Sequence, residues 1–198
     1  MAVNELKYEY NPKWSNEFKD NGFVVLRNVI SSQTLAMLTN YYWFLMRHQK
    51  LERFPTSLGK YGDLLSESLL VGYQKIFEEI IGCSLYPSFS FMRLYYRNSL
   101  LDKHKDREGS EFAVSIAIDY DTEDIWPLYL KDLNGKEHDL KLDRGDLVLY
   151  RGCELIHWRE AYQGKSSLQL FLFYVDTEGP MKQFKFDTRK QLGDPSMI

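Results

Sequence analysis

Cysteine is scarce in this chain and never occurs in closely spaced pairs. The two cysteines, Cys83 and Cys153, lie far apart, and neither belongs to a CxxC motif. Zinc ribbons and thioredoxin-type redox sites need such pairs, so the sequence gives no support to either class. Buried free thiols in a reducing compartment explain the two residues more simply than a disulfide does.

A strong net charge, a signal segment and a long apolar run are also missing. The formal net charge is −3, so no overall field attracts nucleic acid or a membrane surface. The first residues, "MAVNELKYEYNPKW", lack the basic-then-apolar order of a secretory signal, and no apolar run approaches the ~20 residues of a membrane-spanning helix. We therefore expect a soluble, cytoplasmic protein without nucleic-acid or membrane partners.

No repeat, low-complexity tract or flexible linker divides the 198 residues, which fit one domain. Hydrophobic residues make up 44% of the chain, with 14 Tyr and 12 Phe, and supply ample material for a core. The pattern changes near residue 87, from helical periodicity to alternation. We expect a single domain, residues 1–198, in which a helical part (1–86) packs on a β-sheet core (87–198).

The first half predicts one short strand and two helices. The strand covers residues 23–27, and the first helix begins after Ser31 or Ser32, either of which can cap its N-terminus. Apolar residues then recur at three- and four-residue steps, and the same pattern predicts a second helix over residues 64–81. Residues 49–63 lie between the helices and have the composition of a loop, whose tip could act as a mobile lid.

The second half alternates between apolar and polar residues, which is typical of strands. Asn134-Gly135 is a strong signal for a hairpin between two of them. Short strands at this spacing favour a sandwich or barrel. The clearest strands are residues 89–96, 112–120, 147–151 and 167–175.

Of the four histidines, two have simple structural interpretations. His48 ends the first predicted helix, where a cation is favoured by the helix dipole, and His138 lies among charged residues of the hairpin, where a solvated side chain is expected. The other two form a pattern with an aspartate: His104-x-Asp106, then His157. Taken alone, His104 and Asp106 could also be a solvated, salt-bridging turn, and His157 a packed core residue.

Two imidazoles and one carboxylate can occupy one face of an octahedral metal, and Fe(II) in oxygen-activating enzymes is held in this way with three positions left open. The spacing suits such a site. A pair two residues apart at the end of a strand can point in one direction, and the distant His157 can come from a strand across the sandwich.

Four segments, in this order, resemble the Fe(II)/2-oxoglutarate-dependent dioxygenases, most closely the phytanoyl-CoA hydroxylase and prolyl hydroxylase branches. Together they cover about residues 18–45 and 89–175. The resemblance implies a double-stranded β-helix (jelly roll, cupin-like) preceded by helices. The segments are "FKDNGFVVLRNVISSQTL", "RLYYRNSLLDKHKD", "LDRGDLVLYRGCELIHW" and "GKSSLQLFLFYV".

The resemblance also implies a metal site. His104, Asp106 and His157 would be the catalytic iron ligands, and 2-oxoglutarate would chelate the iron through its 2-oxo and C1 carboxylate groups. Tyr95 best matches the strand tyrosine that hydrogen-bonds this cosubstrate, although core packing explains a tyrosine there equally well.

The anchor of the distal carboxylate departs from the family pattern. Members usually carry Arg or Lys on the closing strand, where this chain has Ser166, Ser167 and Leu168. A nearby cation matters because burying an unpaired carboxylate is costly. Lys165 is the first choice for this role, with Arg93 as the fallback.

The resemblance implies an O₂-using hydroxylase that acts on an unactivated C–H bond, and a small metabolite, an acyl conjugate and a peptide side chain are all candidate substrates. The alternatives are a non-enzymatic β-sandwich module and a cupin-like metal enzyme that does not use 2-oxoglutarate. Aromatic residues near the site could line a substrate pocket or form core: Trp126, Tyr129 and Trp158. We expect Arg159 and Glu160 to form an ion pair on the surface of the loop.

Overall fold

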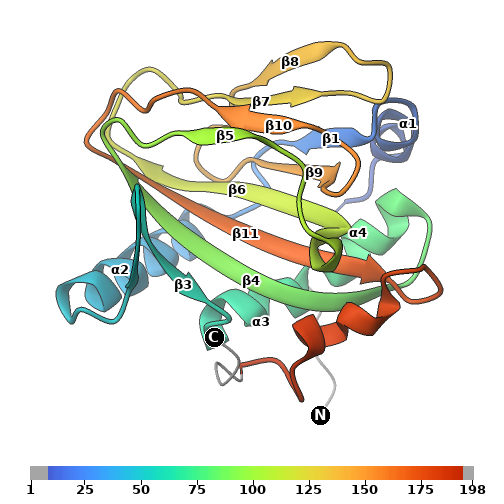
Figure 1. The fold of residues 1–198 in the computed structure, drawn as a ribbon, viewed down its shortest axis with the longest axis horizontal. Helices are drawn as coiled ribbons and strands as arrows, with labels where there is room; N and C mark the ends of the chain where they lie inside the picture. The colour runs from blue at the N-terminus through green and yellow to red at the C-terminus, as the bar shows by residue number, and fades with distance from the viewer. Residues whose placement is uncertain (1–8, 194–198) are drawn as a thin grey trace.

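The fold, seen in a computed structural model that describes residues 9–193, is a sandwich of two antiparallel β-sheets with helices against one of them (Figure 1). The large sheet has the strand order β1-β9-β6-β11-β4-β3-β2 and the small sheet the order β5-β10-β7-β8. The large sheet contains β1 (Phe23–Leu26), β2 (Glu52–Phe54), β3 (Ser57–Tyr61), β4 (Leu85–Tyr96), β6 (Phe112–Tyr120), β9 (Leu147–Arg151) and β11 (Ser166–Asp176). The small sheet contains β5 (Leu101–His104), β7 (Leu128–Lys131), β8 (Glu137–Leu140) and β10 (His157–Arg159).

From β4 onward the chain crosses repeatedly between the two sheets. β4, β6, β9 and β11 lie in the large sheet, and β5, the hairpin β7–β8 and β10 lie in the small one. This winding of eight strands is a double-stranded β-helix, so the expected fold class is confirmed. The hairpin at Asn134-Gly135 is also confirmed, because β7 and β8 pair across it.

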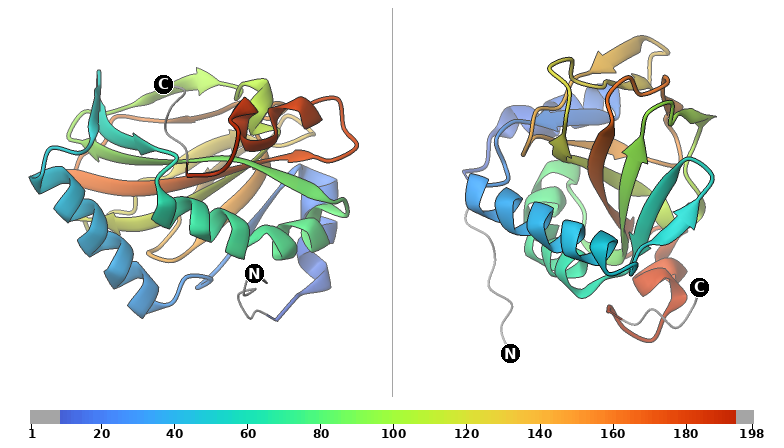
Figure 2. Two further views of the ribbon diagram at one scale, coloured as in Figure 1. Left: turned by 90° about the horizontal axis from the view of Figure 1, so that it is seen from below. Right: turned by 90° about the vertical axis from the view of Figure 1, so that its left-hand side faces the viewer.

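The helices cover the outer face of the large sheet, as Figure 2 shows in its left view. Alternation along each strand separates two cores: on β6, Val114 and Ile116 face the helices, whereas Ala113 and Ala117 face the small sheet. Burying each large aliphatic side chain contributes about 1.5–3 kcal/mol. The helices are α1 (Pro12–Asn21), α2 (Ser32–Arg47), α3 (Leu64–Gly72) and α4 (Gln74–Ile81), and two short 3₁₀ segments are η1 (Glu108–Ser110) and η2 (Lys182–Thr188).

Local signals explain most helix ends. Ser31 caps α2 by accepting a hydrogen bond from the Thr34 amide, as the sequence predicts. The prediction of a single helix over residues 64–81 is wrong, because the structure has two helices there. The first, α3, ends at Gly72, which has a low helix propensity, and α4 begins after Tyr73. Helix α1 was missed, although Asn11 caps it and Pro12 occupies its first turn.

The interpretation of residues 49–63 as a loop is also corrected. These residues form the hairpin β2–β3, and β3 pairs with β4, with Ser57 opposite Tyr95. The first half of the chain therefore contributes β1, β2 and β3 to the large sheet as well as helices. The hairpin stands beside the mouth of the sandwich, where it becomes part of the site described below.

Two further expectations concern cysteines and membrane spans. Cys83 and Cys153 are both free thiols, as expected, but both are half-buried rather than buried. Within residues 9–193, none of the helices has the length and apolar character needed to cross a bilayer.

Candidate metal centre

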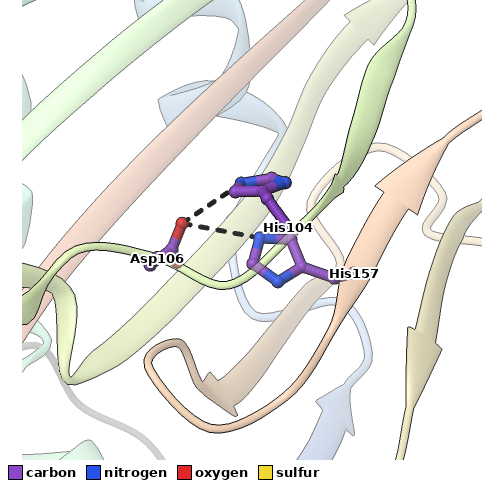
Figure 3. A group of neighbouring side chains, drawn as sticks. All are labelled: His104, Asp106 and His157. Carbon is purple, nitrogen blue, oxygen red and sulfur yellow. Dashed lines mark ion pairs between the residues drawn. The ribbon is translucent and has the colours of Figure 1, made fainter.

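Strand pairing brings the three predicted ligands together. His104 is the last residue of β5, and Asp106 follows in the next turn. His157 is the first residue of β10, which pairs antiparallel with β5 so that His157 lies opposite His104. Segments far apart in the sequence thereby meet at the mouth of the sandwich (Figure 3).

The three side chains converge on one point. The Nε2 atoms of His104 and His157 lie 3.4 Å and 3.5 Å from Oδ1 of Asp106, and the two imidazole centroids are 4.2 Å apart. One donor atom from each residue lies within 4.8 Å of the others. This donor set and spacing are compatible with a metal ion bound between them.

Backbone carbonyls fix the orientation of both imidazoles. Nδ1 of His104 lies 2.8 Å from the Asp102 carbonyl, and Nδ1 of His157 lies 3.0 Å from the Leu155 carbonyl. A carbonyl only accepts, so each Nδ1 carries the proton and donates it. Each ring therefore turns Nε2 toward Asp106, and loss of the Nε2 proton would leave there the lone pair that a metal-ligating histidine needs.

The carboxylate of Asp106 is positioned by a close backbone approach. Its amide donates to the Gly152 carbonyl at 2.9 Å, and a Cβ at position 152 would lie 2.7 Å from its Oδ2. Only glycine leaves that space open. This requirement was not recognised from the sequence, although Gly152 lies in the segment that precedes His157.

The electrostatics of the cluster favour an ionised carboxylate. Burial would raise the pKa of Asp106, but hydrogen bonding with His104 and His157 outweighs it, and the pKa is lowered. The hydrogen bond with Asp106 in turn raises the pKa of His104. Oδ2 of Asp106 is buried without a hydrogen-bond partner among residues 9–193, which leaves acceptor capacity for a cation.

Two buried tyrosines flank the centre. Tyr95 is 1% exposed and packs edge-on against Trp126 at 5.1 Å. Tyr150, which was not predicted, has its hydroxyl 3.4 Å from Nε2 of His157. Burial raises the pKa of both phenols, so both stay protonated and can donate hydrogen bonds.

Arg159 is the least expected residue of the site. It is buried rather than paired with Glu160 on the surface, and Glu160 instead accepts a hydrogen bond from the Trp158 indole at 3.2 Å. Arg159 donates to the Trp126 carbonyl at 2.7 Å and, across the sandwich, to Oε1 of Gln169 on β11 at 3.4 Å. Its Nε has no hydrogen-bond partner among the described residues. Burial lowers its pKa to about 10, so it remains a cation at neutral pH.

The sequence predicts Lys165 or Arg93, rather than Arg159, as the anchor of the distal carboxylate. The side chain of Lys165 is exposed, and its backbone amide donates to Asp121 at 2.8 Å. Arg93 faces the inside of the sandwich, 4.9 Å from the Tyr95 ring, and donates to Oγ of Ser57. For both Lys165 and Arg93, the role of anchoring the distal carboxylate of 2-oxoglutarate stays a prediction.

The candidate pocket aromatics are buried or half-buried. Trp126 belongs to the core between the sheets, and Tyr129 stacks on Trp158 at 5.4 Å. His138 is not simply solvated: Nε2 lies 2.8 Å from an Asp132 carboxylate oxygen, and the ring packs edge-on against Phe23. His48 caps the C-terminus of α2, which agrees with its structural interpretation.

A cavity of about 580 Å³ opens directly beside the centre. His104 and Asp106 form part of its wall, and the hairpin β2–β3, the strands β4 and β11 and the segment η2 supply most of the remainder. Pockets of this size accept small molecules. The other lining residues are Glu52, Phe54, Tyr61, Phe89, Phe91, Lys105, Arg107, Ser110, Phe173 and Asp187.

Comparisons by sequence and by structure give different results. No protein-family model matches the sequence, and no curated protein matches it either. Solved structures do match: a prolyl-4-hydroxylase from Pseudomonas putida is similar at a TM-score of 0.69 and 14% identity, over 82% of this chain and 98% of that one.

Two further solved structures are also similar. The non-heme α-ketoglutarate-dependent carbocyclase SnoK from nogalamycin biosynthesis has a TM-score of 0.74 at 13% identity, over 93% of this chain and 92% of its own. HygX from Streptomyces hygroscopicus, solved with nickel and 2-oxoglutarate bound, has a TM-score of 0.68 at 13% identity, over 85% and 88%. At these identities the likeness establishes a shared double-stranded β-helix fold.

Proposed function

We propose that this protein is an Fe(II)- and 2-oxoglutarate-dependent oxygenase that hydroxylates an unactivated C–H bond of its substrate. The observation that carries the proposal is the convergence of His104, Asp106 and His157, whose donor atoms lie within 4.8 Å of one another at the mouth of a double-stranded β-helix. Similar structures with this fold include proteins described as α-ketoglutarate-dependent or solved with 2-oxoglutarate bound.

The residues present fit an iron ion. Two neutral imidazoles and one carboxylate hold Fe(II) and leave three coordination positions for other ligands. The buried, unpartnered Oδ2 of Asp106 is costly unless something binds it. A cation bound between the two Nε2 atoms and Oδ1 of Asp106, which lies 3.4 Å and 3.5 Å from them, would neutralise the charge of this half-buried carboxylate.

The residues also fit a dicarboxylate inside the sandwich, with Arg159 rather than Lys165 as the anchor of its distal end. Arg159 is a buried cation whose Nε–H has no partner within residues 9–193, and a charge-assisted hydrogen bond offsets the cost of burying a carboxylate. Its guanidinium reaches Gln169 on the closing strand, the strand on which family members usually carry their cation.

Small and polar side chains also face this interior. Ser115 shares the inner face of β6 with two alanines, and its Oγ is buried without a partner within residues 9–193. The protonated hydroxyls of Tyr95 and Tyr150 add neutral donors. We propose that these hydroxyl groups orient the cosubstrate.

In this function each group of the chain has a separate task. When bound, Fe(II) would activate O₂, which is the oxidant, and oxidation of 2-oxoglutarate to succinate and CO₂ would supply two of the four electrons that O₂ takes up. His104, Asp106 and His157 fix the ion, with their Nδ1–H bonds to carbonyls holding the imidazoles in the required tautomer. Arg159 positions the distal carboxylate, and the aromatic walls of the cavity exclude water from the reacting C–H bond.

Succinate formation tests the proposal. Purified protein is supplied with Fe(II), 2-oxoglutarate and air, and succinate is measured with and without each component. Release that requires both Fe(II) and 2-oxoglutarate, and that is lost in His157→Ala, supports the proposal. Iron binding without succinate release would favour a metal enzyme that does not use 2-oxoglutarate. Absence of iron binding would favour a non-enzymatic sandwich.

A further inference from the structure

The cavity beside the metal centre has an unusual wall. Every apolar residue that lines it is aromatic, and none of its lining residues is aliphatic. The core between the two sheets, to which Phe89 and Phe173 belong, is also rich in aromatic residues, but it contains leucines as well, whereas the cavity wall has no aliphatic side chain. The five rings are Phe54, Tyr61, Phe89, Phe91 and Phe173.

The rings form an ordered surface rather than a random cluster. Tyr61 and Phe89 stack at 5.3 Å with an interplanar angle of 23°, and Phe89 and Phe173 stack at 4.3 Å and 24°. Phe54 stands edge-on to Phe91 at 5.4 Å and 81°. Flat π surfaces and ring edges in these orientations favour another ring over a flexible aliphatic chain.

Most charged groups that line the cavity have an oppositely charged partner, and exposed Lys105 is the exception among the described residues. Arg107 donates two hydrogen bonds to Asp187, at 2.7 Å and 2.6 Å, and Tyr61 donates to the same carboxylate. Glu52 lies 3.9 Å from Nζ of Lys60. The interior therefore offers a substrate more ring surface than free charge.

A cationic substrate is disfavoured although aromatic cages commonly bind cations. The guanidinium of Arg107 already lies over the Phe89 ring at 4.4 Å, and that of Arg93 lies 5.6 Å and 5.8 Å from the Phe54 and Phe91 centroids. A second cation would meet these two arginines as well as the rings.

We propose that the cavity binds an uncharged, flat aromatic or polycyclic part of a small-molecule substrate and presents it to the metal centre. That this ligand is a substrate rests on the proposed function, whereas the binding of a ring in the cavity does not. The volume of about 580 Å³ admits a fused ring system of two or more rings, within the range of small-molecule sites.

Calorimetric titration with two matched probes tests the proposal. 2-Naphthol and its saturated counterpart decahydro-2-naphthol share a carbon skeleton and a hydroxyl group but differ in flatness and π character. We expect 2-naphthol to bind about tenfold more tightly, and tetramethylammonium not to compete with it.

Variants locate the binding. Phe54→Leu and Phe91→Leu remove one ring each from the half-buried wall and should weaken 2-naphthol binding about three- to tenfold. The matched control is Phe44→Leu on the outer surface of α2, where the ring is 58% exposed, and it should bind as wild type does. Thermal melting confirms that each variant is folded, and the second cavity variant serves if the first is not.

The outcomes separate this inference from the proposed function. Equal affinity for the two naphthols, equal competition by tetramethylammonium, or binding unchanged in both cavity variants would overturn the aromatic assignment. Mn(II) at the metal centre should broaden the proton resonances of bound 2-naphthol. Selective naphthol binding without that broadening would keep the cavity assignment but count against the metal centre, and broadening without selectivity would do the reverse.

Discussion

Arg107 and Asp187 lie far apart in the sequence and form a two-pronged ion pair at the wall of the cavity, with N···O distances of 2.7 Å and 2.6 Å. The pair holds η2 against the loop that carries Asp106. The backbone of η2 is strained here, because Phe186 and Asp187 have φ values of 55° and 54°. A second pair, between buried Arg189 and Glu67 at 2.6 Å, holds the chain two residues further on, directly after η2.

The Arg107–Asp187 pair predicts a specific dependence of stability on pH. Burial would raise the pKa of Asp187, but hydrogen bonds from Arg107 and Tyr61 outweigh it and lower the pKa below its ordinary value of 3.8. The stabilisation is therefore present above pH 3.8 and is lost as the pH falls through the lower pKa of the folded state. Urea unfolding should show wild type to be more stable than Asp187→Asn at pH 6, with the gap closing toward pH 3. A gap that does not change with pH would contradict this account of the pair.

Replacing the metal ligands should remove iron binding and leave the fold in place. Anaerobic titration with Fe(II) should show at least a hundredfold loss of affinity in His104→Ala and Asp106→Ala, since even changes behind the ligands cost about 10- to 100-fold. Turnover should be abolished in both. Asp102→Ala is the matched control, because its exposed carboxylate is two residues from His104 but outside the cluster. Succinate production that survives in either ligand variant would argue strongly against the site.

The choice between Arg159 and Lys165 is decided by the requirement for 2-oxoglutarate. Arg159→Gln should raise the KM for 2-oxoglutarate by about tenfold or more, because a hydrogen bond to a charged group contributes about 1.5–3 kcal/mol. Its affinity for Fe(II), measured by calorimetry, should stay within about twofold, and Arg159→Lys should restore part of the loss. Lys165→Gln should change neither quantity. The opposite pattern would return the anchor to Lys165, and no change in either variant would make Arg93 the next to test.

Gly152 should matter for metal affinity although it contributes no ligand. A methyl group at this position would clash with the Ser110 carbonyl oxygen and would lie 2.7 Å from Oδ2 of Asp106, so the turn and the carboxylate would both have to shift. Gly152→Ala is therefore expected to weaken Fe(II) binding about tenfold or more, with a thermal melt that still shows a folded protein. Cys153→Ala, one residue along the same turn, should bind Fe(II) normally. Unchanged affinity in Gly152→Ala would show that Asp106 can be accommodated differently.

Much of the fold could be predicted from the sequence because its strands alternate strongly and its turn at Asn134-Gly135 is distinctive. Residues that depend on tertiary pairing were less visible. The hairpin β2–β3 has little periodicity of its own and is stabilised by pairing with β4. The break between α3 and α4 at Gly72 and Tyr73 interrupts an apolar stripe that reads as continuous.

The site divides in the same way. His104, Asp106 and His157 could be found because residue type and spacing carry the signal, and strand pairing then brings them together. Arg159 could not, because a charged residue near Glu160 has a simple interpretation as a surface pair. Its burial follows from its position two residues after His157, on the inward face of β10. Because side chains two residues apart on a strand share a face, the spacing from the candidate ligand His157 was the available signal that Arg159 points inward.

The central claim is that three side chains hold one ferrous ion and leave adjacent positions for 2-oxoglutarate. Its most direct test is the visible spectrum of the anaerobic protein, recorded first with Fe(II) and then during addition of 2-oxoglutarate. The account predicts a charge-transfer band that appears only when both are present, saturates with 2-oxoglutarate and is absent in Asp106→Ala. Tight Fe(II) binding with no band at any 2-oxoglutarate concentration would contradict it.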